Sequence, residues 1–176
     1  MLGASPIVSL EDGSTEANAL KTLYEPAKKN VLRSYPWRCA TKTATLALLD
    51  ETPVDPSWDY AYSVPNDSIR VLAVKQPLSP VTIEWTIEGK KILTNETGAI
   101  ANYIFNVTES QLDAHVEMAL SAKLALDLSY TLTASNTREG NMFEMYEQKL
   151  NEARTTDRQE ASSKVFVIDR LAAVRR

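Results

Sequence analysis

The sequence of 176 residues is poor in the residue types that most often build catalytic and metal sites, because it has one cysteine, one histidine and five glycines. A single cysteine, Cys39, excludes a disulfide bond within the chain, and a single histidine, His115, matches no zinc-ligand spacing. None of the glycines lies in a strand-turn-helix pattern that could cradle a phosphate. We therefore expect no cofactor and no metal ion. We interpret Cys39 and His115 as packing residues, the cysteine in a reducing compartment.

The sequence also lacks a long apolar run and a surplus of basic residues. No segment approaches the roughly 20 apolar residues that span a bilayer, so we expect no membrane partner. The first residues, MLGASPIVSLEDGS, carry no basic charge ahead of the apolar positions, so we expect no signal peptide and synthesis in the cytoplasm. The net charge of −4 argues against a general nucleic-acid-binding protein, which needs Lys and Arg to displace counterions from phosphates.

The hydrophobic fraction of 44% and the charged fraction of 24% are ordinary for a soluble globular protein. The length suits one domain, here residues 1–160, followed by an extended C-terminal arm, residues 161–176. Within the domain, periodicity predicts helical segments over residues 14–49 and 108–160 and a β-rich segment over residues 60–105. We predict an α+β fold, a mainly α-helical bundle with a small antiparallel β-sheet inserted between the first and later helices.

The first predicted helix contains one proline and ends at another. Ser14 is a suitable N-cap, and apolar residues then recur at helical spacing. Pro26 cannot donate a hydrogen bond to the carbonyl of Thr22, so it should kink the helix. Pro36 should end it, at a Tyr-Pro-Trp corner. For residues 38–49 the periodicity does not decide between a short helix and an extended segment.

Between Tyr60 and Phe105 the apolar period changes to two, and turn residues interrupt it near positions 65–67, 88–90 and 98. This pattern predicts a small sheet of about four strands. One of these strands should carry four apolar residues on a single face, namely Val81, Ile83, Trp85 and Ile87.

The remaining domain sequence predicts two helices. Thr108 and Gln111 have the spacing of a capping box, and residues 112–132 are apolar or small almost all round. A helix that is apolar on every side needs cover on every side, so we expect a neighbouring subunit to cover part of it. After a break at residues 135–137, a third helix should run to residue 160 with five residues in register: Phe143, Tyr146, Leu150, Ala153 and Asp157.

The last segment, ASSKVFVIDRLAAVRR, combines four consecutive apolar residues with four basic residues and one acidic residue. One interpretation is a final core strand or a frayed end. The other is an arm that adds a strand to the sheet of another protein, with its basic residues steering it to an acidic surface.

Three carboxylates near the start of the predicted sheet, Asp55, Asp59 and Asp67, leave an enzymatic alternative open. A pair of carboxylates at a defined separation hydrolyses glycosidic bonds, so a peptidoglycan-degrading activity is one reading. Solvation is the more common role of such loop residues. The three tryptophans, Trp37, Trp58 and Trp85, are scattered along the sequence, which indicates core anchors rather than a platform for base stacking.

Four blocks of sequence, taken in order, resemble the tail tubular protein A family, the head-to-tail adaptors of short-tailed bacteriophages. They are EDGSTEANALKTLYEPAKKNVLRSYPWRCA, WDYAYSVPNDSIRVL, EGKKILTN and ALSAKLALDLSYTLTAS. The resemblance implies a structural protein without catalytic activity that forms a dodecameric ring below the portal protein of the capsid. It also implies that the ring receives a tail nozzle of the tail tubular protein B type. Genomic DNA would pass through the ring without specific binding, and the protein would lie in the virion, in the neck of the tail.

Two sets of residues are the candidates for these contacts. The arm that would reach the portal comprises Lys164, Val165, Phe166, Val167, Ile168, Arg170, Leu171, Arg175 and Arg176. The helical faces that would meet neighbouring subunits comprise Leu20, Tyr24, Pro26, Val31, Tyr35, Trp37, Leu120, Leu124 and Leu128. A neck or head-completion protein of another tail type remains an alternative, since it would form the same kind of helical ring with different partners.

Overall fold

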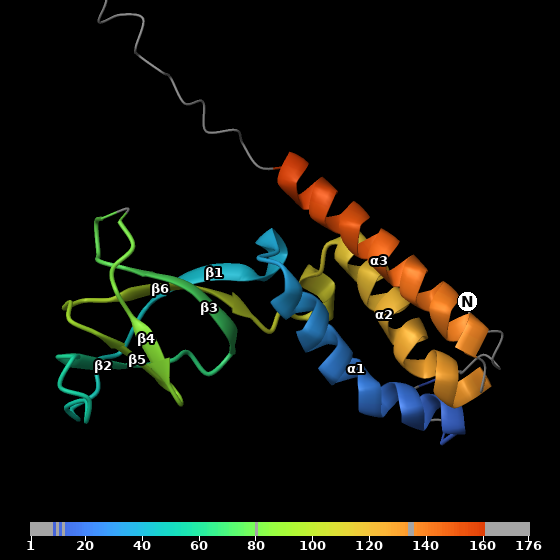
Figure 1. The fold of residues 1–176 in the computed structure, drawn as a ribbon, viewed down its shortest axis with the longest axis horizontal. Helices are drawn as coiled ribbons and strands as arrows, with labels where there is room; N and C mark the ends of the chain where they lie inside the picture. Colours follow the sequence, from blue (N-terminus) through green and yellow to red (C-terminus); the bar gives the residue numbers. More distant parts are fainter. Residues whose placement is uncertain (1–8, 10, 12, 80, 134–135, 161–176) are drawn as a thin grey trace, which may run out of the picture.

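The computed structural model describes residues 9, 11, 13–79, 81–133 and 136–160 of the chain. Three α-helices form one end of the molecule and two small antiparallel sheets form the other (Figure 1). We call these ends the helical part and the β part. The β part is inserted in the chain between the first and second α-helices, which confirms the predicted α+β architecture. The predicted arm, residues 161–176, lies outside the described residues.

The α-helices are α1 (Thr15–Ser34), α2 (Ala114–Thr133) and α3 (Asn136–Gln159). The side chain of Ser14 accepts a hydrogen bond from the amide of Ala17 at 3.1 Å, which confirms the predicted N-cap of α1. This helix continues through Pro26 and bends along its length (Figure 1). It ends as predicted, because Tyr35 takes the extended conformation (φ −154°, ψ 148°) that a residue before proline favours.

The start of α2 differs from the prediction. Thr108 and Gln111 hydrogen-bond to each other at 3.1 Å, but they flank a short 3₁₀ turn, η2 (Glu109–Gln111), and make no capping box. The cap of α2 is Asp113 instead, whose Oδ1 accepts a hydrogen bond from the amide of His115 at 2.9 Å. An aspartate in this position caps a helix as well as a threonine does, so the sequence offered two competing starts.

The β part contains two sheets, so the prediction of one sheet is wrong. The first has the order β1 (Thr41–Thr45), β6 (Ile100–Phe105) and β3 (Ser68–Lys75). The second has the order β2 (Tyr60–Ser63), β5 (Lys91–Thr94) and β4 (Thr86–Glu88). The helical assignment of residues 14–49 is wrong over β1, which follows the 3₁₀ turn η1 (Arg38–Ala40) and pairs with β6. That partner lies far away in sequence, beyond the reach of a local pattern.

The long strand expected over residues 81–87 is also corrected, because only Thr86–Glu88 forms a strand there. Thr82 makes an isolated bridge to Lys75, and the amide of Ile83 donates to the carbonyl of Val74 at 3.0 Å. The chain thus leaves the edge of the first sheet and joins the second, and this crossing interrupts the ladder.

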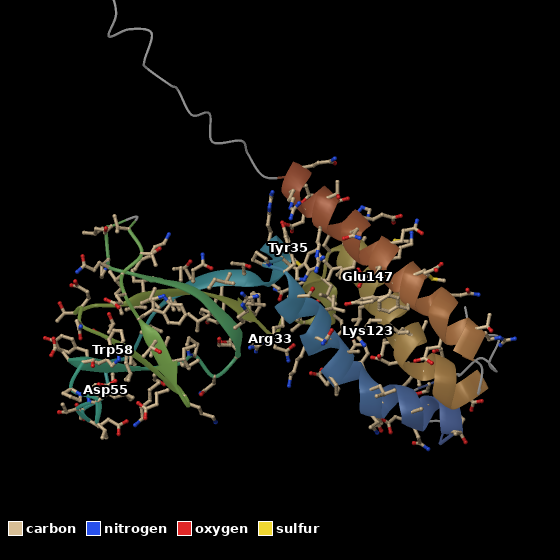
Figure 2. All side chains as sticks on the ribbon, viewed as in Figure 1. Arg33, Tyr35, Asp55, Trp58, Lys123 and Glu147 are labelled. Atoms are coloured by element: carbon tan, nitrogen blue, oxygen red, sulfur yellow. The ribbon has the colours of Figure 1, made fainter. Side chains whose placement is uncertain are left out.

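A hydrophobic core lies between the two sheets. Tyr62 and Ile92 contribute from the second sheet, and Val74 and Tyr103 from the first. Residues 50–59, which connect the two sheets before β2, lie at the end of the β part that faces away from the helices, as Asp55 and Trp58 show in Figure 2.

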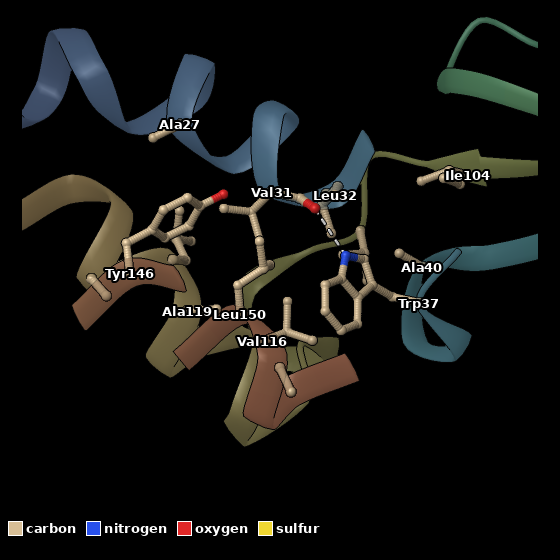
Figure 3. Packing of buried hydrophobic residues seen from close by; sticks show 14 residues of the cluster. Ala27, Val31, Leu32, Trp37, Ala40, Ile104, Val116, Ala119, Tyr146 and Leu150 are labelled. Atoms are coloured by element: carbon tan, nitrogen blue, oxygen red, sulfur yellow. Dashed lines mark hydrogen bonds between the residues drawn. The ribbon is translucent and has the colours of Figure 1, made fainter. Parts of the chain in front are cut away.

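The second and larger core lies in the helical part and surrounds Trp37, which is completely buried (Figure 3). The indole Nε1–H of Trp37 donates to the carbonyl of Val31 at 2.9 Å, so the side chain also satisfies a carbonyl in the last turn of α1. Ile104 of β6 joins this cluster while the adjacent Tyr103 points into the other core. The strand β6 therefore connects the two cores.

Both neighbours of α2 come from its own chain, since the helix contacts α1 and α3 (Figure 1). Val116, Leu120, Ala125 and Leu128 occupy different sides of α2, and all four are buried. Two helices of the same chain thus provide much of the cover that the composition of α2 demands. Met118 of α2 is 48% exposed, so the expectation that a neighbouring subunit covers part of this helix stays a prediction.

Polar contacts join α1 and the corner after it to the later helices. The ammonium group of Lys28, in the middle of α1, is buried and lies 2.8 Å from Glu109 Oε1, which also accepts a hydrogen bond from Tyr24 at 3.2 Å. Burial and the charge of Glu109 raise the pKa of Tyr24 to about 12. At the corner that follows α1, the backbone amide of Arg38 donates to Asp157 Oδ1 at 3.0 Å. These contacts tie α1 to the start of α2 and the corner to α3.

We predict that Trp37→Ala lowers the free energy of unfolding by about 3–5 kcal/mol, because it empties a fully buried site and leaves the carbonyl of Val31 without its partner. Urea unfolding followed by far-UV circular dichroism measures the loss. The half-buried Trp58 is the matched control, and Trp58→Ala should cost less than about 2 kcal/mol. Equal losses for the two variants would contradict the central role given to Trp37.

Candidate functional site

Four of the nine residues predicted to meet neighbouring subunits lie inside the core of a single chain. Val31, Trp37, Leu120 and Leu128 are all at most 5% exposed. A buried side chain offers a neighbour no surface, so the structure corrects their role to core packing. The reason is physical, because an apolar stripe at helical spacing looks the same whether it packs on its own chain or on another.

The other five predicted interface residues are accessible to different degrees. Leu20 and Leu124 are half-buried, and Tyr24 is held by Glu109. Tyr35 packs on Trp37 with ring centroids 4.8 Å apart, and the guanidinium of Arg158 lies 5.6 Å from its ring. Of these five residues only Pro26 is exposed, and it borders a surface hollow. All nine predicted portal-binding residues fall in 161–176, outside the described residues.

One hollow of the surface is a cleft between the end of α1 and both sheets, with a volume of about 520 Å³. Three cationic side chains line it: Arg33 of α1, Arg70 of β3 and Lys90 of the turn between β4 and β5. Its apolar lining includes Ile69 and Ile87, and no carboxylate of the described residues lines it. We call it the basic cleft. A second hollow bordered by Pro26 and Lys29 shares Arg33 with it and extends it along α1.

The two arginines are held in place by backbone carbonyls. Arg33 donates to the carbonyl of Ile69 at 3.0 Å, and Arg70 donates to the carbonyl of Arg33 at 3.3 Å. Within the described part of the chain, no salt bridge engages Arg33, Arg70 or Lys90. Each guanidinium has five N–H donors and uses one of them in these bonds, so most of its donors remain available to a ligand in the cleft.

Sequence reasoning missed the basic cleft because its cations come from three separate elements. Arg33 and Lys29 share one face of α1, because they are four residues apart. This basic pair, close to Pro26, was the one sequence feature that could have indicated a basic site. The proximity of Arg70 and Lys90 depends on how the two sheets pack.

Exposed apolar side chains are concentrated on the β part. Among the described residues, seven large hydrophobic side chains are exposed, and five of them are in the β part: Leu48, Val54, Leu78, Val81 and Ile87. Val54 is 94% exposed and lies in the loop of residues 50–59, which also carries the acids Asp50, Glu51, Asp55 and Asp59. We call this segment the acidic loop. Phe143, predicted to lie in the register of α3, is instead 54% exposed.

Leu78 has a backbone φ of +65°, in the left-handed region that an L-residue with a bulky side chain seldom adopts. Its side chain is fully exposed, so no packing in the chain offsets this conformation. Strained residues of this kind cluster at ligand clamps and other functional positions.

Two of the three carboxylates of the enzymatic alternative, Asp55 and Asp67, are engaged in separate local contacts. Asp55 accepts a hydrogen bond from the amide of Ser57 at 2.9 Å, and this contact lowers its pKa. Asp67 binds the ammonium group of Lys42 and accepts a hydrogen bond from Tyr103 at 3.2 Å, and these partners lower its pKa as well. A glycosidase needs one carboxyl group with a raised pKa to act as the acid, so neither Asp55 nor Asp67 suits that role.

Other expectations concern single residues. Burial raises the pKa of the half-buried Cys39, as expected for a packing residue. His115 is half-buried and borders an open polar hollow beside α3 with Gln148 and Glu152. In the described ranges, no group of three or more His, Cys, Asp or Glu residues could hold a metal ion. No described helix is long and apolar enough to cross a membrane.

No protein-family model matches this sequence, and no curated protein matches it either. The function therefore has to be inferred from the surfaces described above together with the four blocks of sequence.

Asp67 provides a test of these electrostatics. Because the folded-state pKa of Asp67 lies below its ordinary value, its stabilising effect should be present above about pH 4 and be lost as the pH falls through the folded-state pKa. We predict that Asp67→Asn lowers the free energy of unfolding at pH 6 and that this difference shrinks as the pH falls through the acid range. Urea unfolding of both proteins across this range measures it. A difference that persists at the lowest pH would contradict the assigned pair with Lys42.

Proposed function

We propose that this protein is a structural head-to-tail adaptor of a short-tailed bacteriophage. Copies of the chain would form a ring, a dodecamer by the resemblance, between the portal and the tail nozzle. Genomic DNA would pass through the ring without specific contacts, and the location would be the neck of the virion. The proposal assigns the protein no catalytic activity, no cofactor and no metal ion.

The observation that carries this proposal is the set of exposed apolar side chains on the β part. Single exposed apolar residues are normal, but here five protrude from one small part of the molecule, and Leu78 does so at a cost in backbone strain. Burying a side chain of this kind contributes about 1.5–3 kcal/mol, so several together favour assembly with other chains. The resemblance of the four ordered sequence blocks supports the choice of a head-to-tail adaptor.

The net charge of −4 agrees with a conduit. Affinity for DNA without sequence preference comes from neutralising phosphates, so a wall with few free cations lets the genome pass without tight contacts.

Electron microscopy of the purified protein, alone and mixed with the portal protein, tests the proposal. We expect rings stacked on the portal. A free protein that stays monomeric agrees with the proposal provided that it forms rings on the portal. Rings on a partner from another tail type would favour the neck-protein alternative, and clearing on a peptidoglycan gel that depends on Asp55, Asp59 or Asp67 would favour the enzymatic one.

Leu78→Gly should separate stability from assembly. Glycine adopts a positive φ without strain, so we expect the free energy of unfolding to rise by about 0.5–1 kcal/mol. The same change removes an exposed apolar side chain, so binding to the portal or nozzle should weaken. Thermal unfolding and a pull-down assay measure the two effects. A variant that loses stability and keeps full binding would contradict both statements.

Removal of residues 161–176 tests the predicted arm. We expect the shortened chain to fold, because residues before 161 already form two hydrophobic cores, but to lose binding to the portal. In the full chain, Val167→Asp or Phe166→Ala should weaken portal binding more than changes on the exposed face of α3 such as Glu144→Ala. A pull-down with portal protein measures this. Undiminished binding after the deletion would rule out the arm.

A further inference from the structure

We propose that the acidic loop of one copy docks into the basic cleft of the next copy in the ring. This inference rests on the proposed function, since it names a contact from which the ring would be built. Residues 50–59 are the inserted element, and Arg33, Arg70 and Lys90 are the groups that receive it.

The cleft is suited to an acidic segment that also carries an apolar side chain. Its three cations have no carboxylate partner within the described residues, and two are oriented by backbone carbonyls at 3.0 and 3.3 Å. Such fixed donors lose little conformational freedom when they bind a carboxylate. The exposed Ile87 and the half-buried Ile69 supply an apolar wall beside the charges.

The acidic loop has the complementary character. Of its four acids only Glu51 has a salt-bridge partner in the described part of the chain, Lys91 at 2.8 Å. Val54 protrudes among the acids and is almost fully exposed. The loop is also shaped in advance, because the amides of Ser57 and Trp58 bond to Asp55 at 2.9 and 3.2 Å and two prolines restrict its backbone.

Within one chain only the start of the loop approaches the cleft, where Glu51 pairs with Lys91, the residue after Lys90. Figure 2 shows Asp55 at the outer end of the β part and Arg33 at its junction with the helices. A contact between two different surfaces of identical chains is heterologous, and it closes into a ring when the rotation between neighbouring copies divides a full turn. A second copy is therefore the partner whose charge, apolar content and symmetry fit the cleft.

Charge exchange between the two surfaces tests this contact. The cleft variant is Arg70→Glu with Lys90→Glu, and it leaves Arg33 and its bond to β3 intact. The loop variant is Asp50→Lys with Asp59→Lys, and it leaves the Asp55 turn intact. We expect each variant alone to form rings on the portal at least about tenfold less readily than the natural chain. An equal mixture should recover, because every acidic loop then finds a basic cleft and every basic loop finds an acidic one in an alternating ring.

The matched control is Lys21→Glu with Lys149→Glu, which changes the net charge by the same amount as the cleft variant, away from the cleft. It should assemble like the natural chain, and circular dichroism should show that all variants are folded. Assembly by folded cleft and loop variants, or no recovery in the mixture, would overturn the inference and leave the proposed function standing. If the natural chain forms no ring with or without portal, the proposed function fails and the inference with it.

Labelled duplex DNA is the last probe. The inference expects weak binding to the natural chain that does not depend on Arg70 and Lys90. Tight DNA binding that the cleft variant loses, with assembly unchanged, would make the cleft a phosphate site and overturn the inference.

Discussion

The burial of Trp37 at the corner between α1 and β1 is the constraint on which the rest of the structure depends. Its indole ring joins residues of α1, α2, α3 and β6 in one cluster, and its N–H satisfies a carbonyl in the last turn of α1. Because Pro36 stops the helix immediately before it, the direction in which the chain leaves α1 is fixed. That direction sets Arg33 against the carbonyl of Ile69 and so shapes the basic cleft. The packing of Trp37 in the core thereby helps to determine the shape of the basic cleft on the surface.

Local patterns predicted what depends on neighbours in sequence. The N-cap at Ser14, the end of α1 before Pro36 and the three long helices all follow from spacing and capping chemistry. Patterns failed where the partner is distant. The strand β1 is specified by its pairing with β6, and the two sheets arise because the chain crosses between them near Thr82. Likewise, the apolar faces of α2 could not reveal that α1 and α3 cover them.

The same limit applies to the interaction surfaces. Apolar residues on helices were natural candidates for subunit contacts, yet Val31, Trp37, Leu120 and Leu128 serve the core. The accessible apolar residues lie instead on the β part, most of them in its connections and Ile87 in the edge strand β4. The basic cleft was missed for the same reason, because its three cations come from three separate elements. The sequence pattern brought together only Arg33 and Lys29, and Lys29 borders the neighbouring hollow. The chain therefore buries two hydrophobic cores and leaves exposed apolar and charged side chains mainly in the connections of the β part. Such a distribution suits a subunit that assembles with other chains.

The central claim is that copies of this chain close a ring at the junction of a viral capsid and its tail. A cryo-electron microscopy map of the virions tests it most directly. The account predicts density below the portal vertex into which the helical part and the β part fit as repeated subunits around the DNA channel. A map in which that position is filled by a different fold, with no density for this chain, would contradict the account.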